Sequence, residues 1–262
     1  MREILEKVAK GLISVDEAER LLRVLTVEEI GNMARIDVGR EYRKGIPEVI
    51  LAEGKDAGDL AQIAATMLRE SGRAIISRAV SDQIHAIREA LSDDTLAQVN
   101  DKARLMVIKK KNFVTKKTGG KIGILTGGTS DIPVAEEARV IAQEMGCDVI
   151  TAYDVGVAGI HRLIPPLKEM IARDVDALVV VAGREGALPS VVAGIVDVPL
   201  IAVPTSIGYG LGEKGVSALM AMLQSCSLGL AIVNIDSGIA AGAVATLIAN
   251  RVARFRQERS ED

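Results

Sequence analysis

The stretch KIGILTGGTSDIPVAEEARVIAQEMGCDVITAYD, residues 121–154, decides the fold. It opens and closes on short, nearly continuous apolar runs, KIGILT and DVITAY, which are typical of strands buried on both faces. Residues 134–145 between them form a helical stretch. A buried strand, a helix and a second buried strand predict two parallel strands joined by a crossover helix.

The same alternation continues toward the C-terminus. Strands are predicted at residues 121–126, 148–153, 176–182, 198–203 and 230–235. Helices are predicted at residues 134–145, 164–173, 189–196, 215–225 and 239–256. This order indicates the α/β class, here a doubly wound parallel sheet of about five strands. In such sheets the ligand binds beyond the carboxyl ends of the strands.

The first part of the chain has a different pattern. Ser14 and Glu17 have capping-box spacing before a predicted helix at residues 18–24. A second helix is predicted at residues 55–70, and short strands at residues 34–38, 48–52, 74–80 and 104–108. We therefore expect a smaller N-terminal α+β domain at residues 1–118 and a catalytic domain at residues 119–262.

Two basic segments of this first part have alternative interpretations. KKKNFVTKKTGG, residues 109–120, is interpreted as a solvated domain linker, with a phosphate-binding patch as the alternative. ARIDVGREYRKG, residues 34–45, is interpreted as a charged surface loop, and the alternative is that it reaches a substrate phosphate.

The composition excludes several classes of protein. Aromatic residues make up 2% of the chain and the net charge is −3, so a nucleic acid is not expected as a partner. The two cysteines cannot build a disulfide framework and have no metal-ligand spacing, which favours a reducing compartment. The charged N-terminus is not a signal peptide, and no apolar stretch is long enough for a membrane span. We expect a cytoplasmic protein without a membrane partner.

Glycine-rich loops follow the predicted strands. The first is GGTSD, comprising Gly127, Gly128, Thr129, Ser130 and Asp131. Glycines let a backbone approach a ligand closely, and the N-terminus of the following helix offers free N–H groups, so we expect phosphate binding here. The alternative is that Ser130 or Asp131 only caps the helix.

Three further loops are expected at the same edge of the sheet. Their candidate residues are Asp154 and Gly156 in DVGVAGIHR, Gly183, Arg184, Glu185 and Gly186 in AGREGALPS, and Ser206 and Gly208 in PTSIGYG. Each charged residue alone could be a solvated loop residue. Their coincidence at strand ends favours a site. Cys226 in QSCSLG, taken alone, is more typical of a small buried residue than of a nucleophile, and so is Cys147.

Together these segments resemble a known family. The series GGTSD, DVGVAGIHR, AGREGALPSVVAG, PTSIGYG, MLQSCS and VNIDSG resembles the LarB family, which acts in biosynthesis of the nickel-pincer nucleotide, and GIPEVILAEGK (residues 45–55) resembles its N-terminal domain. The C-terminal half is similar to PurE, the aminoimidazole ribonucleotide carboxylase or mutase, which implies a PurE- or flavodoxin-like three-layer fold. It lacks the Ser-Ala-His-Arg-Thr-Pro sequence that supplies the catalytic histidine of PurE.

The LarB resemblance implies a carboxylase and hydrolase. The implied substrate is nicotinic acid adenine dinucleotide, which is carboxylated at C5 of the pyridinium ring and then hydrolysed to AMP and pyridinium-3,5-biscarboxylic acid mononucleotide. Cys226 matches the family's nucleophile, and Glu185 or Asp154 is the candidate base. Two alternatives remain: a PurE-like enzyme acting on a purine ribonucleotide, and a non-enzymatic nucleotide-binding protein.

The resemblance also bears on cofactors and assembly. Carbon dioxide or bicarbonate is the expected co-substrate, and no tightly bound cofactor is expected. A Mg²⁺ requirement stays open, because Asp131, Asp154 and Glu185 have no recognisable ligand spacing. The likeness to PurE favours a symmetric homo-oligomer such as an octamer.

Overall fold

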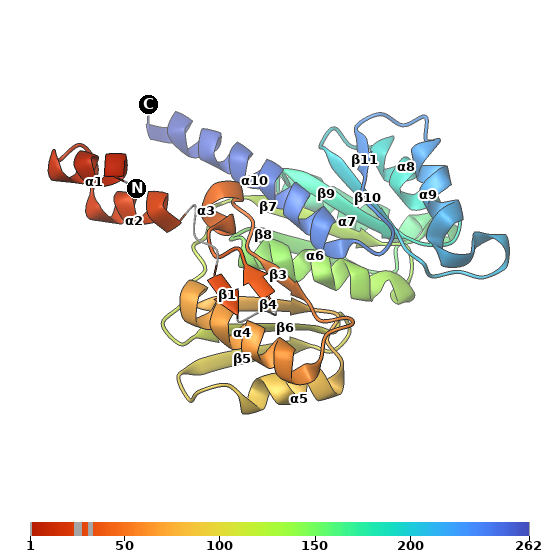
Figure 1. The fold of residues 1–262 in the computed structure, drawn as a ribbon. Coiled ribbons are helices and arrows are strands. Elements are labelled where there is room, and N and C mark those ends of the chain that lie inside the picture. The colour runs from red at the N-terminus through yellow and green to blue at the C-terminus, as the bar shows by residue number, and fades with distance from the viewer. Residues whose placement is uncertain (1, 24–27, 31–33, 262) are drawn as a thin grey trace. The chain divides into compact units, whose positions relative to one another are not determined.

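The computed structural model describes residues 2–23, 28–30 and 34–261 (Figure 1). By its internal contacts the chain divides into two compact units, Met1–Val114 and Thr115–Asp262. Residues 111–120 contain no helix or strand. The two units are described separately below.

The C-terminal unit is built on a parallel sheet of five strands in the order β11, β10, β9, β7, β8. The strands are β7 (Lys121–Thr126), β8 (Asp148–Ala152), β9 (Ala177–Ala182), β10 (Leu200–Pro204) and β11 (Leu230–Ile232). Every neighbouring pair is parallel. The predicted doubly wound α/β sheet is therefore confirmed. The last strand is shorter than expected, since it ends at Ile232.

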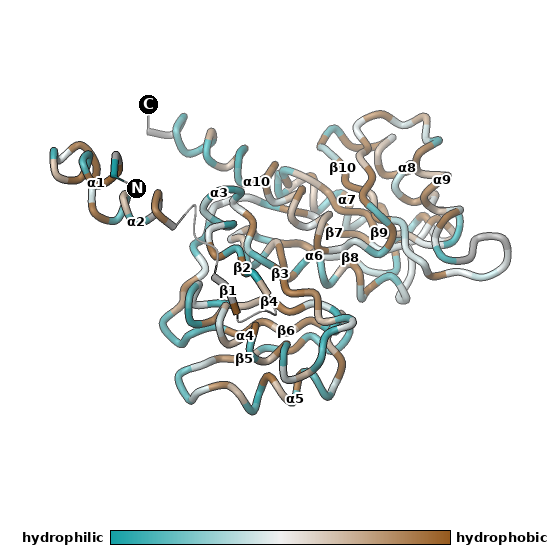
Figure 2. Tube along the Cα trace, in the orientation of Figure 1, coloured by the Kyte–Doolittle hydropathy of each residue, from teal (hydrophilic) through white to brown (hydrophobic). Residues whose placement is uncertain are grey.

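Helices cover both faces of this sheet. They are α6 (Ile132–Glu144), α7 (Ile164–Ala172), α8 (Ala187–Ala193), α9 (Val216–Leu223) and α10 (Gly238–Glu261). Side chains of β9 alternate between two cores, because Leu178 and Val180 pack with α7, α8 and α9, whereas Val179 and Val181 pack with α6 and α10. Figure 2 shows the apolar central strands and the hydrophilic C-terminal turns of α10. The arrangement is the expected three-layer fold.

Helices α6 and α10 pack closely because small residues line their contact. A Cβ atom added to Gly242 would lie 2.6 Å from the carbonyl oxygen of Ala138 and 2.3 Å from the side chain of Ile141. Only glycine fits at that crossing. Helix α6 begins at Ile132, two residues before the predicted start, because Pro133 is well suited to a first helical turn.

The N-terminal unit contains a four-stranded sheet in the order β3, β4, β6, β5. Its strands are β3 (Val49–Leu51), β4 (Arg73–Ser77), β5 (Thr95–Asn100) and β6 (Leu105–Lys110), and its long helix is α4 (Ala57–Ser71). Helix α4 packs its apolar face, including Leu60, Ala64 and Met67, into the core of this unit. The smaller α+β fold is confirmed.

The remaining elements of this unit are short. They are α1 (Arg2–Ala9), α2 (Val15–Arg23), β1 (Glu28–Ile30), β2 (Ala34–Ile36), α3 (Arg40–Lys44) and α5 (Ser81–Glu89). The backbone N–H of Glu17 donates to Oγ of Ser14 at 3.1 Å, as the capping-box spacing predicts. Helix α2 begins at Val15, three residues before the predicted start, and the predicted helix end at residue 24 lies outside the described residues.

Candidate active site

The loops after β7, β8, β9 and β10 surround one cavity at the carboxyl edge of the sheet. Its volume is about 640 Å³. Among the expected residues, Gly127, Gly128, Ser130, Asp131, Gly156, Gly183, Arg184, Glu185 and Gly208 line it. A cavity of this volume is within the range of small-molecule sites in proteins.

The GGTSD loop is held by a buried carboxylate. Asp131 is 5% exposed; its Oδ2 accepts a hydrogen bond from the backbone N–H of Gly128 at 2.9 Å, and its Oδ1 accepts one from the hydroxyl of Thr205 at 2.7 Å. Burial raises the pKa of Asp131 above its ordinary value, although these hydrogen bonds act in the other direction. The side chain makes no cap to the first turn of α6. Asp131 therefore shapes the loop and joins it to the end of β10.

The glycines of the site have two different physical roles. A Cβ atom at Gly156 would lie 2.4 Å from the carbonyl oxygen of Gly127, and one at Gly183 would lie 2.4 Å from that of Ile207. These two glycines are needed for the loops to pack on one another. A Cβ at Gly128 would meet only Oδ2 of Asp131, at 3.8 Å, so the protein itself does not require a glycine there. Gly128 leaves open space for a ligand.

Two guanidinium groups line the cavity. Arg162 forms an ion pair with Asp154, with Nη1 2.5 Å from Oδ2. The guanidinium of Arg184 lies 4.1 Å from the ring centroid of Tyr209, and contact with Tyr209 raises the pKa of Arg184. Both arginines keep their positive charge at neutral pH. They are the anion-binding groups of a lining that also contains the carboxylates of Asp131 and Glu185.

The two carboxylates considered as bases occupy different positions. Glu185 lines the cavity and is exposed, and its carboxylate makes no hydrogen bond or ion pair within the part of the chain that the structure describes. Asp154 is held by Arg162 and does not itself line the cavity. Of the two, Glu185 is placed to act on a molecule in the cavity.

Four other expected residues lie outside the cavity lining. Thr129 is exposed beside it, and the backbone N–H of Ser206 donates to Asp236 at 2.8 Å. Gly186 has a φ of 63° and packs on the backbone of Ala218. The fourth is Cys226.

Cys226 lies toward the other end of the strands. It is exposed and lies shortly before β11. The nearby Gly229 accepts a hydrogen bond at its carbonyl oxygen from the backbone N–H of Leu200, the first residue of β10, so this segment lies at the amino ends of the strands. The hydroxyl of the adjacent Ser227 donates to the carbonyl of Ser190 within α8, whereas the cavity reaches only Ala187 and Leu188 at the start of that helix. One chain therefore does not bring Cys226 and the glycine loops together.

Cys147 has the environment of a structural residue. It is fully buried, its thiol donates to Oδ1 of Asn250 at 3.2 Å, and burial raises its pKa to about 11. A thiol in that state is a poor nucleophile at neutral pH.

Several lining residues were absent from the predicted set. They are Val157, Ala158, Arg162, Ala182, Ala187, Leu188, Ile207 and Tyr209. Most belong to the same loops that the strand-end rule selects, and Arg162 and Tyr209 stand in the quoted motifs DVGVAGIHR and PTSIGYG. Apolar residues of these loops carry no distinguishing chemistry in the sequence, so nothing marks them as lining.

The described part of the chain contains neither a metal-binding cluster of side chains nor a membrane-spanning helix. Within residues 2–23, 28–30 and 34–261, no three His, Cys, Asp or Glu side chains lie close enough together to hold a metal ion. No helix in that same part is long and apolar enough to cross a membrane.

The parallel sheet and its glycine-lined, arginine-bearing cavity define the class of PurE-like α/β proteins. Residues 121–261 match the family model for AIR carboxylase, and residues 27–111 match the model for the LarB/PurE-like N-terminal domain. The chain belongs to the LarB family, whose C-terminal domain is PurE-like. This is a family of the carboxylase and mutase type.

Similar proteins agree with this assignment. An uncharacterized protein of Methanocaldococcus jannaschii is 46% identical over 254 residues, which are 95% of this chain and 96% of that protein. An N5-carboxyaminoimidazole ribonucleotide mutase of the same organism is 35% identical over 120 residues, covering 45% of this chain and 71% of the mutase. The mutase of Thermotoga maritima is 26% identical over 147 residues, covering 54% of this chain and 84% of that enzyme.

Proposed function

We propose that this protein is a pyridinium-3,5-biscarboxylic acid mononucleotide synthase. It carboxylates nicotinic acid adenine dinucleotide at C5 of the pyridinium ring and hydrolyses the phosphoanhydride, releasing AMP. The observation that carries the proposal is the cavity at the carboxyl edge of the sheet, where Arg162 and Arg184 face an open glycine loop. Two guanidinium groups beside a loop that leaves open space suit a diphosphate.

The chemistry requires a nucleophile because a pyridinium ring is electron-poor at C5. Addition of the Cys226 thiolate to C4 converts the ring into a dihydropyridine whose C5 is an enamine carbon. C5 then forms a bond to carbon dioxide, and a base removes the C5 proton. The C4–S bond breaks, the electron pair returns to sulfur, and the ring becomes aromatic again. Covalent catalysis of this kind divides one difficult step into easier ones.

Glu185 is the base in this proposal. Its carboxylate is at the cavity and forms no ion pair with the described residues, although it interacts electrostatically with the adjacent Arg184, whereas Asp154 is paired with Arg162. Arg162 and Arg184 hold the phosphates, and Gly127, Gly128 and Ser130 approach them. Carbon dioxide or bicarbonate is the co-substrate. The chemistry of the lining gives no reason to assign a resident metal, and a Mg²⁺ requirement is tested by adding a chelator.

The position of Cys226 gives the proposal a further requirement. Since Cys226 lies outside the cavity of its own chain, a second copy supplies the thiol, and the active form is a homo-oligomer. Exposed apolar residues close to Cys226 in the chain support such an assembly: Met220 and Leu223 in the second half of α9 are each 59% exposed, and Leu228 is 90% exposed. Apolar side chains in that arrangement are typical of a protein interface.

A second function is favoured by the named relatives. The mutases that this chain resembles act on N5-carboxyaminoimidazole ribonucleotide according to their names. A PurE-like activity here would need to proceed without the Ser-Ala-His-Arg-Thr-Pro sequence and would leave Cys226 unused.

One experiment separates the two functions. The protein is incubated with nicotinic acid adenine dinucleotide and ¹³C-bicarbonate, with and without a chelator, and in parallel with N5-carboxyaminoimidazole ribonucleotide. We expect AMP and a mononucleotide carrying one ¹³C carboxylate in the first reaction, measured by mass spectrometry. Turnover of the aminoimidazole ribonucleotide alone would establish the second function instead. Binding of the dinucleotide without turnover would establish a non-enzymatic protein.

A further inference from the structure

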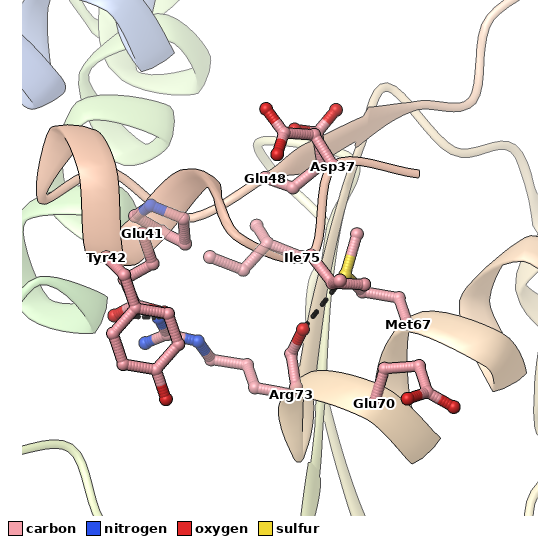
Figure 3. A pocket seen from close by; sticks show the side chains of 11 residues that line it. Asp37, Glu41, Tyr42, Glu48, Met67, Glu70, Arg73 and Ile75 are labelled. Atoms are coloured by element: carbon pink, nitrogen blue, oxygen red, sulfur yellow. Dashed lines mark hydrogen bonds and ion pairs between the residues drawn. The ribbon is translucent and has the colours of Figure 1, made fainter. Parts of the chain in front are cut away.

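The N-terminal unit contains a second cavity, of about 170 Å³, whose polar side chains are engaged with one another (Figure 3). It is lined by the segment around α3, the C-terminal end of α4 and the start of β4. Four carboxylates line it, and each forms an ion pair with an arginine. The pairs are Asp37 with Arg43, Glu41 with Arg73, Glu48 with Arg40, and Glu70 with Arg69. The charges of this cavity are therefore used within the unit.

The cavity of the C-terminal unit contains an aromatic side chain to which the proposed function gives no role. Among the described residues of its lining, Tyr209 is the one aromatic residue, and it is 76% exposed. The whole chain has only three tyrosines, two phenylalanines and no tryptophan. An aromatic ring left open at a ligand cavity is a surface on which another flat ring can stack.

Arg184 contacts the ring of Tyr209. Its guanidinium carbon lies over the ring, 4.1 Å from the ring centroid, which is within the range of a cation–π contact. A guanidinium that contacts a ring through its face keeps N–H groups at its edge for a phosphate. We call these two residues the Arg184–Tyr209 pair. The pair combines a flat aromatic surface and a phosphate-binding cation in one wall of the cavity.

The proposed substrate carries two flat rings, and their charges differ. The pyridinium ring is a cation, so stacking on Tyr209 would bring it close to the positive charge of Arg184, at a cost. The same ring also has to meet Glu185 and the thiol of the second copy. Adenine is neutral and takes no part in the chemistry, so it meets neither restriction.

We propose that the Arg184–Tyr209 pair binds the adenine base of the dinucleotide. The base stacks on the open part of the Tyr209 ring, and the edge of the Arg184 guanidinium donates to the adjoining phosphate. The identity of the base rests on the proposed function, since stacking alone accepts any neutral base. This inference assigns the AMP half of the substrate to the loops after β9 and β10.

The test measures binding without turnover, on the full chain. Three probes are compared: AMP carries the base, ribose 5-phosphate lacks it, and nicotinic acid mononucleotide carries the pyridinium ring in its place. In isothermal titration, AMP should bind about tenfold more tightly than ribose 5-phosphate, which is a usual gain for a base stacked on an aromatic side chain.

Variants locate the base. Tyr209→Leu should weaken AMP binding by about tenfold and leave the binding of the other two probes unchanged. Tyr209→Phe keeps a ring and should bind AMP as the wild type does. Tyr42→Leu is the matched control, because Tyr42 is a half-exposed tyrosine at the other cavity, and it should also bind AMP normally (Figure 3). Circular dichroism and size-exclusion chromatography check the fold and the oligomeric mass of each variant.

Several outcomes would overturn the proposal. Equal affinity for AMP and ribose 5-phosphate, or unchanged AMP affinity of Tyr209→Leu, would remove the stacked base. Weaker binding of nicotinic acid mononucleotide by Tyr209→Leu, with AMP unaffected, would place the pyridinium ring on Tyr209 instead. A changed oligomeric mass of Tyr209→Leu would make Tyr209 an interface residue. Failure of the proposed function has a different signature: the wild type would not carboxylate the dinucleotide, while AMP binding would still depend on Tyr209.

Discussion

The cavity of the C-terminal unit is bounded mainly by loop backbone, and the cavity of the N-terminal unit is bounded mainly by side chains. The lining of the first includes Arg162, Arg184, Asp131 and Glu185 beside its glycines, whereas the second is lined by four carboxylates that are each ion-paired with an arginine. The difference follows from the folds. A parallel sheet collects the loops after its strands at one edge, while the second cavity is assembled from the flank of α3, α4 and β4.

The same comparison separates two kinds of polar interaction. In the N-terminal unit the ion pairs join side chain to side chain, as in Arg40 with Glu48. At the C-terminal cavity the buried carboxylate of Asp131 binds the backbone N–H of Gly128 and the hydroxyl of Thr205. The loop backbone is thereby fixed, while Asp154 and Tyr209 hold the two lining arginines at the cavity. A fixed backbone with positioned cations suits the binding of an anionic substrate.

The largest expected effect distinguishes the two cysteines. Cys226→Ala should abolish carboxylation of the dinucleotide, because no other described thiol is exposed, while the fold is retained. The transient absorbance of a dihydropyridine should then appear only in the wild-type reaction. Cys147→Ala is the matched control and should lose about 1 kcal/mol of stability with turnover kept. Full activity of Cys226→Ala would remove the covalent mechanism.

The requirement for a second copy can be tested with the same variant. Cys226→Ala has an intact cavity, and Glu185→Gln has an intact thiol but lacks the proposed base, so its turnover should be about 10²- to 10⁴-fold lower. If the thiol comes from a partner, a mixture of these two impaired variants, refolded together, should regain part of the wild-type activity. Absence of any recovery, with mixed oligomers shown by mass spectrometry, would mean that each chain supplies its own thiol.

The next effect concerns proton removal at the C-terminal cavity. Glu185→Gln keeps the shape of the side chain and removes its basicity, so turnover should fall by about 10²- to 10⁴-fold, as is typical of a lost general base. Glu48→Gln makes the same chemical change at the N-terminal cavity and should leave turnover unchanged. Steady-state kinetics measure both. If Glu185→Gln raises the Michaelis constant and leaves turnover unchanged, Glu185 is a binding residue and Asp154 becomes the candidate base.

The sequence predicted the parallel sheet well because its strands are buried on both faces. Continuous apolar runs such as ALVVVA in β9 leave little alternative to a central strand. Strand β5 of the N-terminal unit was not predicted, and the reason is physical. It reads TLAQVN and contains no buried residue, so it has no clear apolar period.

The candidate site was predictable to the extent that it follows from topology. The loops after β7, β8, β9 and β10 were expected at one edge, and they surround one cavity. The position of Cys226 follows from the same rule, since a residue before a parallel strand belongs to the opposite edge. The resemblance to the LarB family assigned a catalytic role to Cys226 but did not indicate where Cys226 lies in the fold. The cavity around Asp37 depends on ion pairs between residues distant in sequence, such as Arg73 with Glu41, which no local pattern reveals.

A smaller effect distinguishes two glycines of the same cavity. Gly128 has φ −136° and ψ 174°, which a β-branched residue adopts easily, and its Cβ would enter open space. Gly128→Val should therefore keep its thermal stability and raise the Michaelis constant for the dinucleotide by about tenfold or more, a loss of about 1.4 kcal/mol in binding. Gly183→Ala should instead lower the thermal stability, because its Cβ would lie 2.4 Å from the carbonyl oxygen of Ile207, and should leave the Michaelis constant nearly unchanged. An unchanged Michaelis constant in Gly128→Val would place the phosphates elsewhere.

The smallest expected effect is a difference in pH dependence between one aspartate of each unit. Burial raises the pKa of Asp131, so its native form binds a proton more readily than its unfolded form. The contribution of Asp131 to the free energy of unfolding should therefore fall as pH rises from about 3.8 through the higher native pKa. Asp94 is the opposite case, because a hydrogen bond from Ser92 lowers its pKa. Its contribution is present above pH 3.8 and is lost as pH falls through the lower native pKa. Urea unfolding from pH 3 to pH 7 on wild type, Asp131→Asn and Asp94→Asn measures both. The difference in the free energy of unfolding between wild type and Asp131→Asn should shrink as pH rises. The difference between wild type and Asp94→Asn should shrink as pH falls. If both differences changed with pH in the same direction, Asp131 would be hydrated in the native state.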